Sequence, residues 1–76
     1  MPMAYVLFNT EIGSEREVLK AVKDVDGVQE AFGLFGVYDI IARVRADTKD
    51  TLAQIVNKKL QLSKVHTKLT VIVSET

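Results

Sequence analysis

Short apolar runs and helical stripes alternate along the chain. Residues 4–9 form a compact apolar and aromatic run that stops at polar residues, which is typical of a buried strand. Residues 28–35 and 38–45 are also strand-like, and the glycine between them at Gly36 predicts a hairpin that turns near Gly36 and Val37. Residues 65–73 alternate in character and predict a fourth strand.

Two amphipathic helices separate these strands. Ser14 and Glu17 have the spacing of a capping box, in which the serine hydroxyl caps the helix and the glutamate reaches back to the cap. The first helix is therefore predicted to start at Ser14 and to end at Gly27. Asp47 or Thr48 can cap the second helix, which is predicted to end near residue 60. The apolar stripes of the two helices are Val18, Leu19, Val22 and Val25 in the first, and Leu52, Ile55, Val56 and Leu60 in the second.

The resulting order, strand-helix-strand-strand-helix-strand, predicts one α+β domain over residues 1–76. Two such strand-helix-strand units imply the ferredoxin-like split sandwich, with four antiparallel strands and both helices on one face. In that layout the strands at residues 4–9 and 38–45 are central, and their alternation places the side chains of Val6, Phe8, Ile40, Ala42 and Val44 beneath the helices.

The opposite face of the predicted sheet has no cover within one chain. We expect Tyr5, Leu7, Ile41 and Ile72 to form an apolar patch there, which small soluble monomers rarely expose. The sequence therefore predicts a dimer formed through this sheet face. The alternative is a monomer in which the aliphatic stems of Arg43, Arg45 and Lys68 shield the patch.

Composition narrows the classes of function. Ten basic and ten acidic residues give a net charge of zero, so direct binding to nucleic acid is not expected. The absence of cysteine excludes thiolate metal sites and thiol catalysis. No apolar stretch approaches the length of a membrane span, and no signal peptide is recognisable, so a cytoplasmic location is expected and no membrane partner.

Few residues suggest chemistry. His66 is the only histidine and has no cysteine or spaced carboxylate pair with which to bind a metal. The turn from Gly36 to Asp39 combines free backbone amides with a carboxylate, and these can hold the two poles of an α-amino acid. A plain hairpin with a solvated Asp39 is the alternative, because glycine and aspartate are common turn residues.

The chain resembles the effector-binding domain of the Lrp/AsnC, or feast/famine, family of regulators. The resemblance rests on the run at residues 5–8, the Gly27-Val28 pair, the turn at residues 36–40, Asp47, and residues 65–67. It implies sheet-to-sheet dimers that assemble into octamers or similar rings, with an amino-acid effector held between dimers. By matching position, the implied ligand-binding residues are Phe35, Gly36, Val37, Tyr38 and Asp39, together with Asp47 and Thr67.

A non-enzymatic regulatory domain is the function that follows, with no cofactor. The first strand begins at the third or fourth residue, so no DNA-reading domain is expected, and an effect on transcription would pass through full-length relatives in the same assembly. Val37 replaces a residue that is often polar in the family, which favours an apolar ligand. Two alternatives remain open: a small dimeric α+β barrel enzyme of the cofactor-free oxygenase type, and an ACT-like regulatory module.

Overall fold

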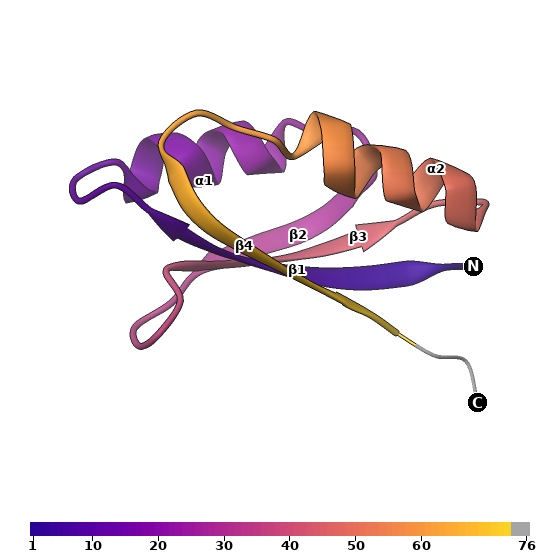
Figure 1. The fold of residues 1–76 in the computed structure, drawn as a ribbon, viewed down its shortest axis with the longest axis horizontal. Coiled ribbons are helices and arrows are strands. Elements are labelled where there is room, and N and C mark those ends of the chain that lie inside the picture. The colour runs from indigo at the N-terminus through magenta and orange to yellow at the C-terminus, as the bar shows by residue number, and fades with distance from the viewer. Residues whose placement is uncertain (74–76) are drawn as a thin grey trace.

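A computed structural model describes residues 1–73 and has the predicted order of elements (Figure 1). The strands are β1 (Met3–Thr10), β2 (Val28–Gly33), β3 (Ile40–Arg45) and β4 (Val65–Ile72). The helices are α1 (Glu15–Lys23) and α2 (Lys49–Gln54), and α2 continues into a π-helical turn, η1 (Ile55–Lys59). The strands form one sheet in the order β2-β3-β1-β4 with antiparallel neighbours, which confirms the ferredoxin-like fold.

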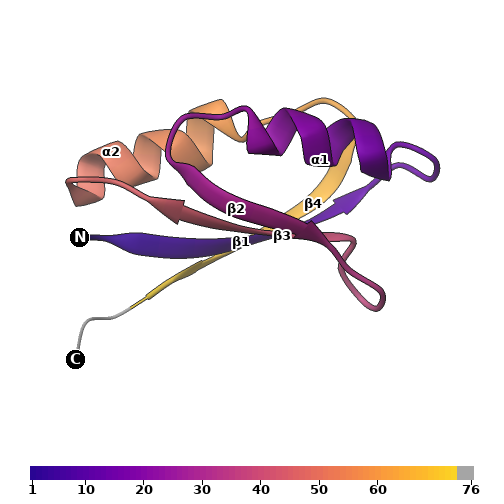
Figure 2. The ribbon, with the colours of Figure 1, turned by 180° about the vertical axis from the view of Figure 1, so that it is seen from behind.

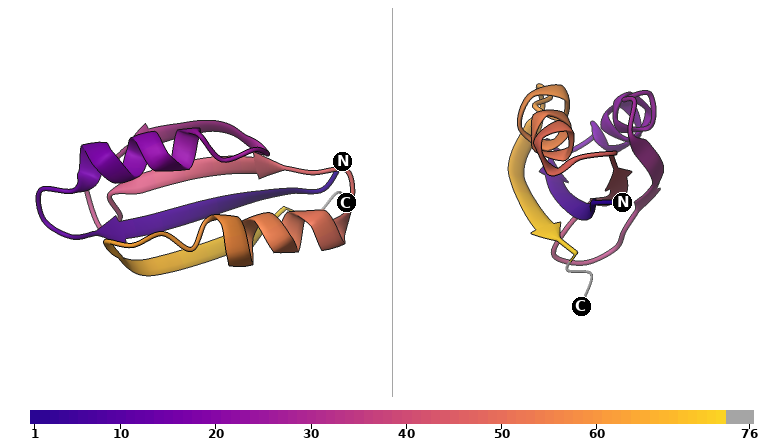
Figure 3. Two further views of the ribbon diagram at one scale, coloured as in Figure 1. Left: turned by 90° about the horizontal axis from the view of Figure 1, so that it is seen from above. Right: turned by 90° about the vertical axis from the view of Figure 1, so that its right-hand side faces the viewer.

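Both helices cover the same face of the sheet, as the views from behind and from the end show (Figures 2 and 3). Every second residue of β1 is buried against them, because side chains alternate between the two faces of a strand. This core contains the predicted inward positions on β1 and β3, and the apolar stripes of both helices pack into or against it. Its largest fully buried side chains are Phe8, Ile40, Leu52, Leu60, Val6, Val22 and Val44.

The second helix is capped by Thr48, as predicted, but it ends in a π-helical turn that the sequence did not predict. The Thr48 hydroxyl accepts a hydrogen bond from the backbone N–H of Thr51 at 3.1 Å and caps the helix. In η1, the N–H of Leu60 donates to the Ile55 carbonyl, five residues earlier, at 2.9 Å. Leu60 is thereby fully buried, while the neighbouring lysines stay exposed.

The predicted capping box of the first helix is wrong. Ser14 occupies the cap position, but its side chain makes no capping hydrogen bond. The Glu17 carboxylate instead accepts two hydrogen bonds from Lys64 Nζ, at 2.9 and 3.0 Å, and so ties α1 to the loop before β4. The helix also ends at Lys23, and Gly27, with a φ of +99°, lies in the following turn.

The position of Ile72 is a second correction. Strand pairing places Ile72 opposite Ala4, and residues directly opposite in an antiparallel pair share a face, so Ile72 lies on the helix side. Leu69 and Val71, opposite Leu7 and Tyr5, lie on the open face in its place. The alternation along β4 was predicted correctly, but the choice of face was not.

Lys68 is misplaced by the prediction for the same reason. It pairs with Phe8 and therefore lies on the helix side, where its Nζ donates to the Val56 carbonyl at 2.6 Å. Arg43 does lie on the open face, and its guanidinium contacts the Glu30 carboxylate at 3.2 Å. Lys68 therefore contributes nothing to shielding the open face.

Candidate functional site

The loop between β2 and β3, residues 34–39, extends beyond the sheet on the side away from the helices (Figures 1 and 2). Its base is closed by a hydrogen bond from the Leu34 N–H to the Asp39 carbonyl at 2.8 Å. Phe35 is fully exposed at its tip, and Val37 is largely exposed. The loop therefore presents apolar side chains to any molecule that approaches this end of the open face.

Asp39 fixes the loop to the end of β1. Its backbone N–H donates to the Phe8 carbonyl at 2.9 Å. Its carboxylate oxygen Oδ2 accepts the Thr10 N–H at 2.9 Å and lies 3.4 Å from the Thr10 hydroxyl. The alternative of a merely solvated Asp39 is therefore wrong, because the half-buried carboxylate supplies an acceptor to a buried strand residue.

Several polar groups of the turn have no hydrogen-bond partner among the described residues. Within the described residues, the backbone N–H groups of residues 35–38 donate no hydrogen bond, and the second carboxylate oxygen of Asp39, Oδ1, accepts none. Gly36 has a φ of +141° and open space around it, so the backbone can approach a ligand closely there. Donors for an anion and an acceptor for a cation thus occur in one short loop.

The structure brings only some of the predicted site residues to this end of the sheet. Tyr38 is part of the loop and is half-buried. Thr67 pairs with Asn9 near the end of β1, so it lies at the same end, exposed on the open face. Asp47 follows β3 at its far end and is separated from the loop by the length of that strand.

The open face contains a small apolar cavity of about 120 Å³. It is lined by Tyr5, Glu30, Phe32, Ile41 and Arg43. Phe32 is more than half exposed. The sequence did not predict that Phe32, Leu69 and Val71 belong to the open face. The pairing of Phe32 with Ile41 places it on this face, and that signal becomes visible only once the strand register is known.

The part of the chain that the structure describes offers neither a metal-binding cluster nor a helix that could span a membrane. No group of three or more His, Cys, Asp or Glu side chains in residues 1–73 is arranged to hold a metal ion. Within the same range, no helix has the length and apolar character needed to cross a bilayer.

Residues 3–76 match the model of the Lrp/AsnC ligand binding domain. The chain belongs to this family. Among solved structures, FFRP-DM1 is 32% identical with a TM-score of 0.91, and the match covers 97% of this chain and all of FFRP-DM1. A hypothetical protein from Pyrococcus horikoshii, PHS023, is 31% identical with a TM-score of 0.91, and the match covers all of this chain and 93% of that one. No match was found among curated proteins.

Larger members of the family share the fold at lower identity. AsnC of E. coli is 19% identical with a TM-score of 0.87, and the match covers 99% of this chain but 52% of AsnC. The transcriptional regulator NMB0573 from Neisseria meningitidis, solved as a complex with L-Met, is 17% identical with a TM-score of 0.78. The match covers 97% of this chain and 50% of that one. The chain thus corresponds to about half of these regulators.

Proposed function

We propose that this domain senses a free amino acid through the β2–β3 turn and carries out no catalysis. The observation that carries the proposal is the unpaired Asp39 Oδ1 beside the unpaired N–H groups of residues 35–38. The ammonium group of the ligand binds Oδ1 and its carboxylate accepts from the N–H groups. The family's ligand-binding description and the L-Met complex of NMB0573 support this class of ligand.

The tip of the turn favours an apolar amino acid. Phe35 and Val37 are exposed and offer no hydrogen bond to a polar ligand side chain. A buried polar group without a partner costs about 1–3 kcal/mol, so a polar ligand would bind less tightly there. We therefore expect aliphatic or thioether side chains to be preferred over charged ones.

A second copy of the chain covers the open face in this proposal. The face carries Phe32, Leu69 and Val71, each at least 44% exposed, beside the partly exposed Tyr5, Leu7 and Ile41. Burying apolar surface stabilises an assembly by roughly 25 cal/mol per Å². This gain matters for a 76-residue chain, because a chain of that length can form only a small core of its own. Further association into rings completes the ligand site from neighbouring dimers.

Ligand binding between copies then regulates the assembly. A ligand that binds only the assembled form stabilises it by RT ln(1 + [L]/Kd), about 2.7 kcal/mol at a hundredfold excess over Kd. Such a shift changes the populations of dimers and rings. Contact with longer members of the family in mixed rings would carry the signal to DNA, while this domain itself makes no DNA contact.

Binding at the turn is tested by titrating the twenty amino acids in thermal-shift and calorimetric assays. We expect one or a few apolar amino acids to raise the Tm of the parent protein and to lose at least tenfold in affinity with Asp39→Asn. Asp24→Asn is the control, because it removes the same charge from an exposed carboxylate at the end of α1. Equal affinity in all three proteins would place the site elsewhere, and no binding to the parent would refute the proposal.

The sheet-face dimer has a matched pair of variants on one strand. Leu69 and Ile72 are both apolar and exposed, but Leu69 lies on the open face and Ile72 on the helix side. We expect Leu69→Lys to reduce the molar mass from light scattering to that of a monomer, while Ile72→Lys leaves it unchanged. A dimer that survives Leu69→Lys, or one that only Ile72→Lys breaks, would contradict the assignment of this face.

A further inference from the structure

A concavity of about 360 Å³, the η1–β4 concavity, lies between η1 and β4 on the helix side of the sheet. β4 is an edge strand, and the helical segment that ends in η1 lies above it (Figure 3). The β2–β3 turn extends away from the helices, so the two places are separate. The volume is at the lower end of the range of small-molecule sites.

Two irregularities of the backbone meet at the η1–β4 concavity. The π-helical turn of η1 supplies Asn57 to one wall. On the opposite wall, the register between β4 and β1 shifts beside Asn9, and the two successive residues Val65 and His66 both line the concavity. Because π-turns and β-bulges are common beside functional sites, their meeting here points to a binding site.

The polar side chains that line the η1–β4 concavity offer one ammonium group, one imidazole and two carboxamides, and no carboxylate of a described residue lines it. They belong to Lys68, His66, Asn57 and Gln61. The sequence has the same bias, because residues 51–74 contain four lysines, the only histidine and no acidic residue in a chain of zero net charge. An anion therefore meets attraction without repulsion, whereas a cation meets the reverse.

Lys68 is held in position before any ligand binds. Its Nζ donates to the Val56 carbonyl at 2.6 Å, and the residue is half-buried. An ammonium group has three N–H donors, and the described residues occupy only one of them. The contact also offsets the partial negative charge of a carbonyl near the end of the helical segment. A lysine that is already fixed loses less conformational entropy when it binds an anion.

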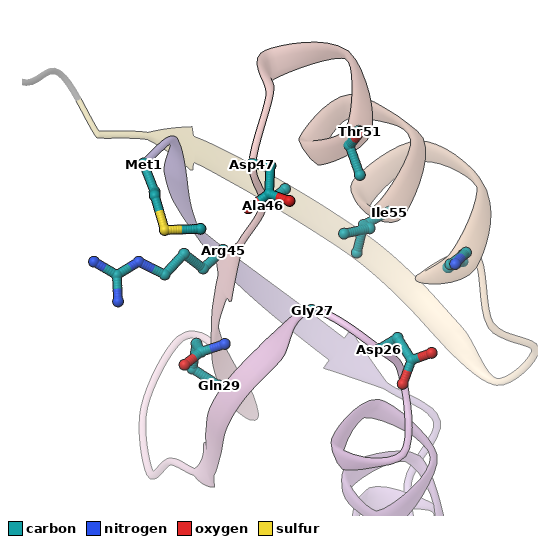
Figure 4. A pocket seen from close by; sticks show the side chains of 10 residues that line it. Met1, Asp26, Gly27, Gln29, Arg45, Ala46, Asp47, Thr51 and Ile55 are labelled. Carbon is teal, nitrogen blue, oxygen red and sulfur yellow. The ribbon is translucent and has the colours of Figure 1, made fainter.

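Another concavity, of about 300 Å³, differs in its charges (Figure 4). It lies near the N-terminus, at the far end of β3, and contains Asp47, which the resemblance assigned to the effector site. Its charged lining residues have both signs, Asp26 and Asp47 against Arg45 and Lys59. Selection for an anion is therefore a property of the η1–β4 concavity and not of this one.

We infer that the η1–β4 concavity binds a small aliphatic 2-oxo acid, which has one negative charge and no ammonium group. The carboxylate accepts hydrogen bonds from Lys68 Nζ and the His66 imidazole, and the oxo oxygen accepts one from a carboxamide. The aliphatic chain packs on the half-buried Leu62 and Val65. A free amino acid is disfavoured, because its ammonium group would lie near Lys68 without a carboxylate to bind. The inference does not rest on the proposed function of the turn.

The test is an NMR titration of ¹⁵N-labelled protein with 4-methyl-2-oxopentanoate. We expect saturable shifts of the backbone amides of Gln61, Leu62 and His66, and at least a tenfold loss of affinity in Lys68→Met. Lys58→Met is the matched control, because it removes the same charge from the same basic segment outside the concavity and should bind as the parent does.

A second variant separates binding from stability, since Lys68→Met also removes a hydrogen bond of the fold. His66 is exposed, so His66→Phe should fold as the parent does and lose at least threefold in affinity. If both variants bound the oxo acid as tightly as the parent, or if Lys58→Met lost as much affinity as Lys68→Met, the inference would be wrong.

Two analogues of the ligand test its chemistry. L-leucine carries an ammonium group in place of the oxo oxygen and should shift the amides of Gln61, Leu62 and His66 with at least tenfold lower affinity. 4-methylpentanoate has neither group and should bind at least threefold more weakly than the oxo acid. Equal binding of either analogue would overturn the assignment of this ligand class.

The Asp39→Asn variant distinguishes this inference from the proposed function. It should bind 4-methyl-2-oxopentanoate as tightly as the parent, because Asp39 does not line the η1–β4 concavity. Loss of the shifts in Asp39→Asn would assign the oxo acid to the turn and overturn the inference. Absence of any shift at Gln61, Leu62 and His66 would also overturn it, and would leave amino-acid binding at the turn untouched.

Discussion

Replacing Asp39 with alanine tests whether its carboxylate holds the β2–β3 turn to β1. Alanine removes the acceptor of the Thr10 N–H, and Thr10 is only 7% exposed, so this donor would have no partner. An unpaired buried donor costs about 1–3 kcal/mol. The contact with the Thr10 hydroxyl, at 3.4 Å, is too long to add much. We therefore expect Asp39→Ala to lower the free energy of unfolding by about 1–3 kcal/mol.

Asparagine at the same position separates stability from ligand binding. Its side-chain oxygen can still accept the Thr10 N–H, and only the extra strength of a charged acceptor is lost, so we expect Asp39→Asn to cost about 1 kcal/mol or less. Both variants keep the backbone hydrogen bonds of the residue. Asp39→Ala is therefore a poor probe of binding, because it also loosens the turn.

Urea unfolding followed by circular dichroism, at several fixed protein concentrations, measures these differences independently of assembly. Asp24→Ala is the control for loss of a carboxylate at an exposed position and should lie within about 0.5 kcal/mol of the parent. An Asp39→Ala variant as stable as that control would refute the reasoning. So would an asparagine variant that loses as much as the alanine variant.

Four further substitutions test individual glycines and lysines of the fold. Gly27→Ala should lower the free energy of unfolding by about 2–5 kcal/mol, because it adds a Cβ 2.6 Å from a buried isoleucine at a φ of +99°. Gly36→Ala should cost less in a parallel melt, since nothing lies within 4 Å. The pKa of Lys64 is raised above 10.5, chiefly by its hydrogen bond to Glu17, so its contribution to stability is complete below pH 10.5 and is lost as pH rises through the folded-state value. Urea unfolding should therefore show a steeper loss of stability above pH 10.5 in the parent than in Lys64→Met. Lys68→Met removes a hydrogen bond to the end of the helical segment and should cost about 1 kcal/mol in the same assay.

Local patterns in the sequence were sufficient for the order of elements and for most of the core. The stripe of α2 was predicted correctly, but η1 was not. At about 100° per residue, an uninterrupted α-helix would place Lys59 nearer the centre of the stripe than Leu60. The π-helical turn inserts one residue and brings Leu60 into the core. Whether the helix forms this π-helical turn depends on how it packs on the sheet, and the sequence pattern alone does not describe that packing.

The other wrong predictions concern residues whose partners lie far away in the sequence. Glu17 has the spacing of a capping residue, yet Lys64, 47 positions later, takes its carboxylate. The face of Ile72 depends on the pairing of β4 with β1, which includes a register shift beside Asn9. The turn itself could be found from its glycine and aspartate, whereas the second role of Asp39 required the position of Thr10.

The anchoring of the turn to β1 also determines how far a movement at the ligand site can travel. Thr10, at the end of β1, holds the Asp39 carboxylate, and the same strand carries Tyr5 and Leu7 on the open face. β1 is hydrogen-bonded on both sides, to β3 and β4, so it cannot slide along its own length without breaking these hydrogen bonds. In the proposed function, a ligand that pulls on Asp39 would therefore either break the hydrogen bond to Thr10 or move the sheet as a whole. In the second case, Tyr5 and Leu7 would move as well, and with them the surface that we propose a second copy covers.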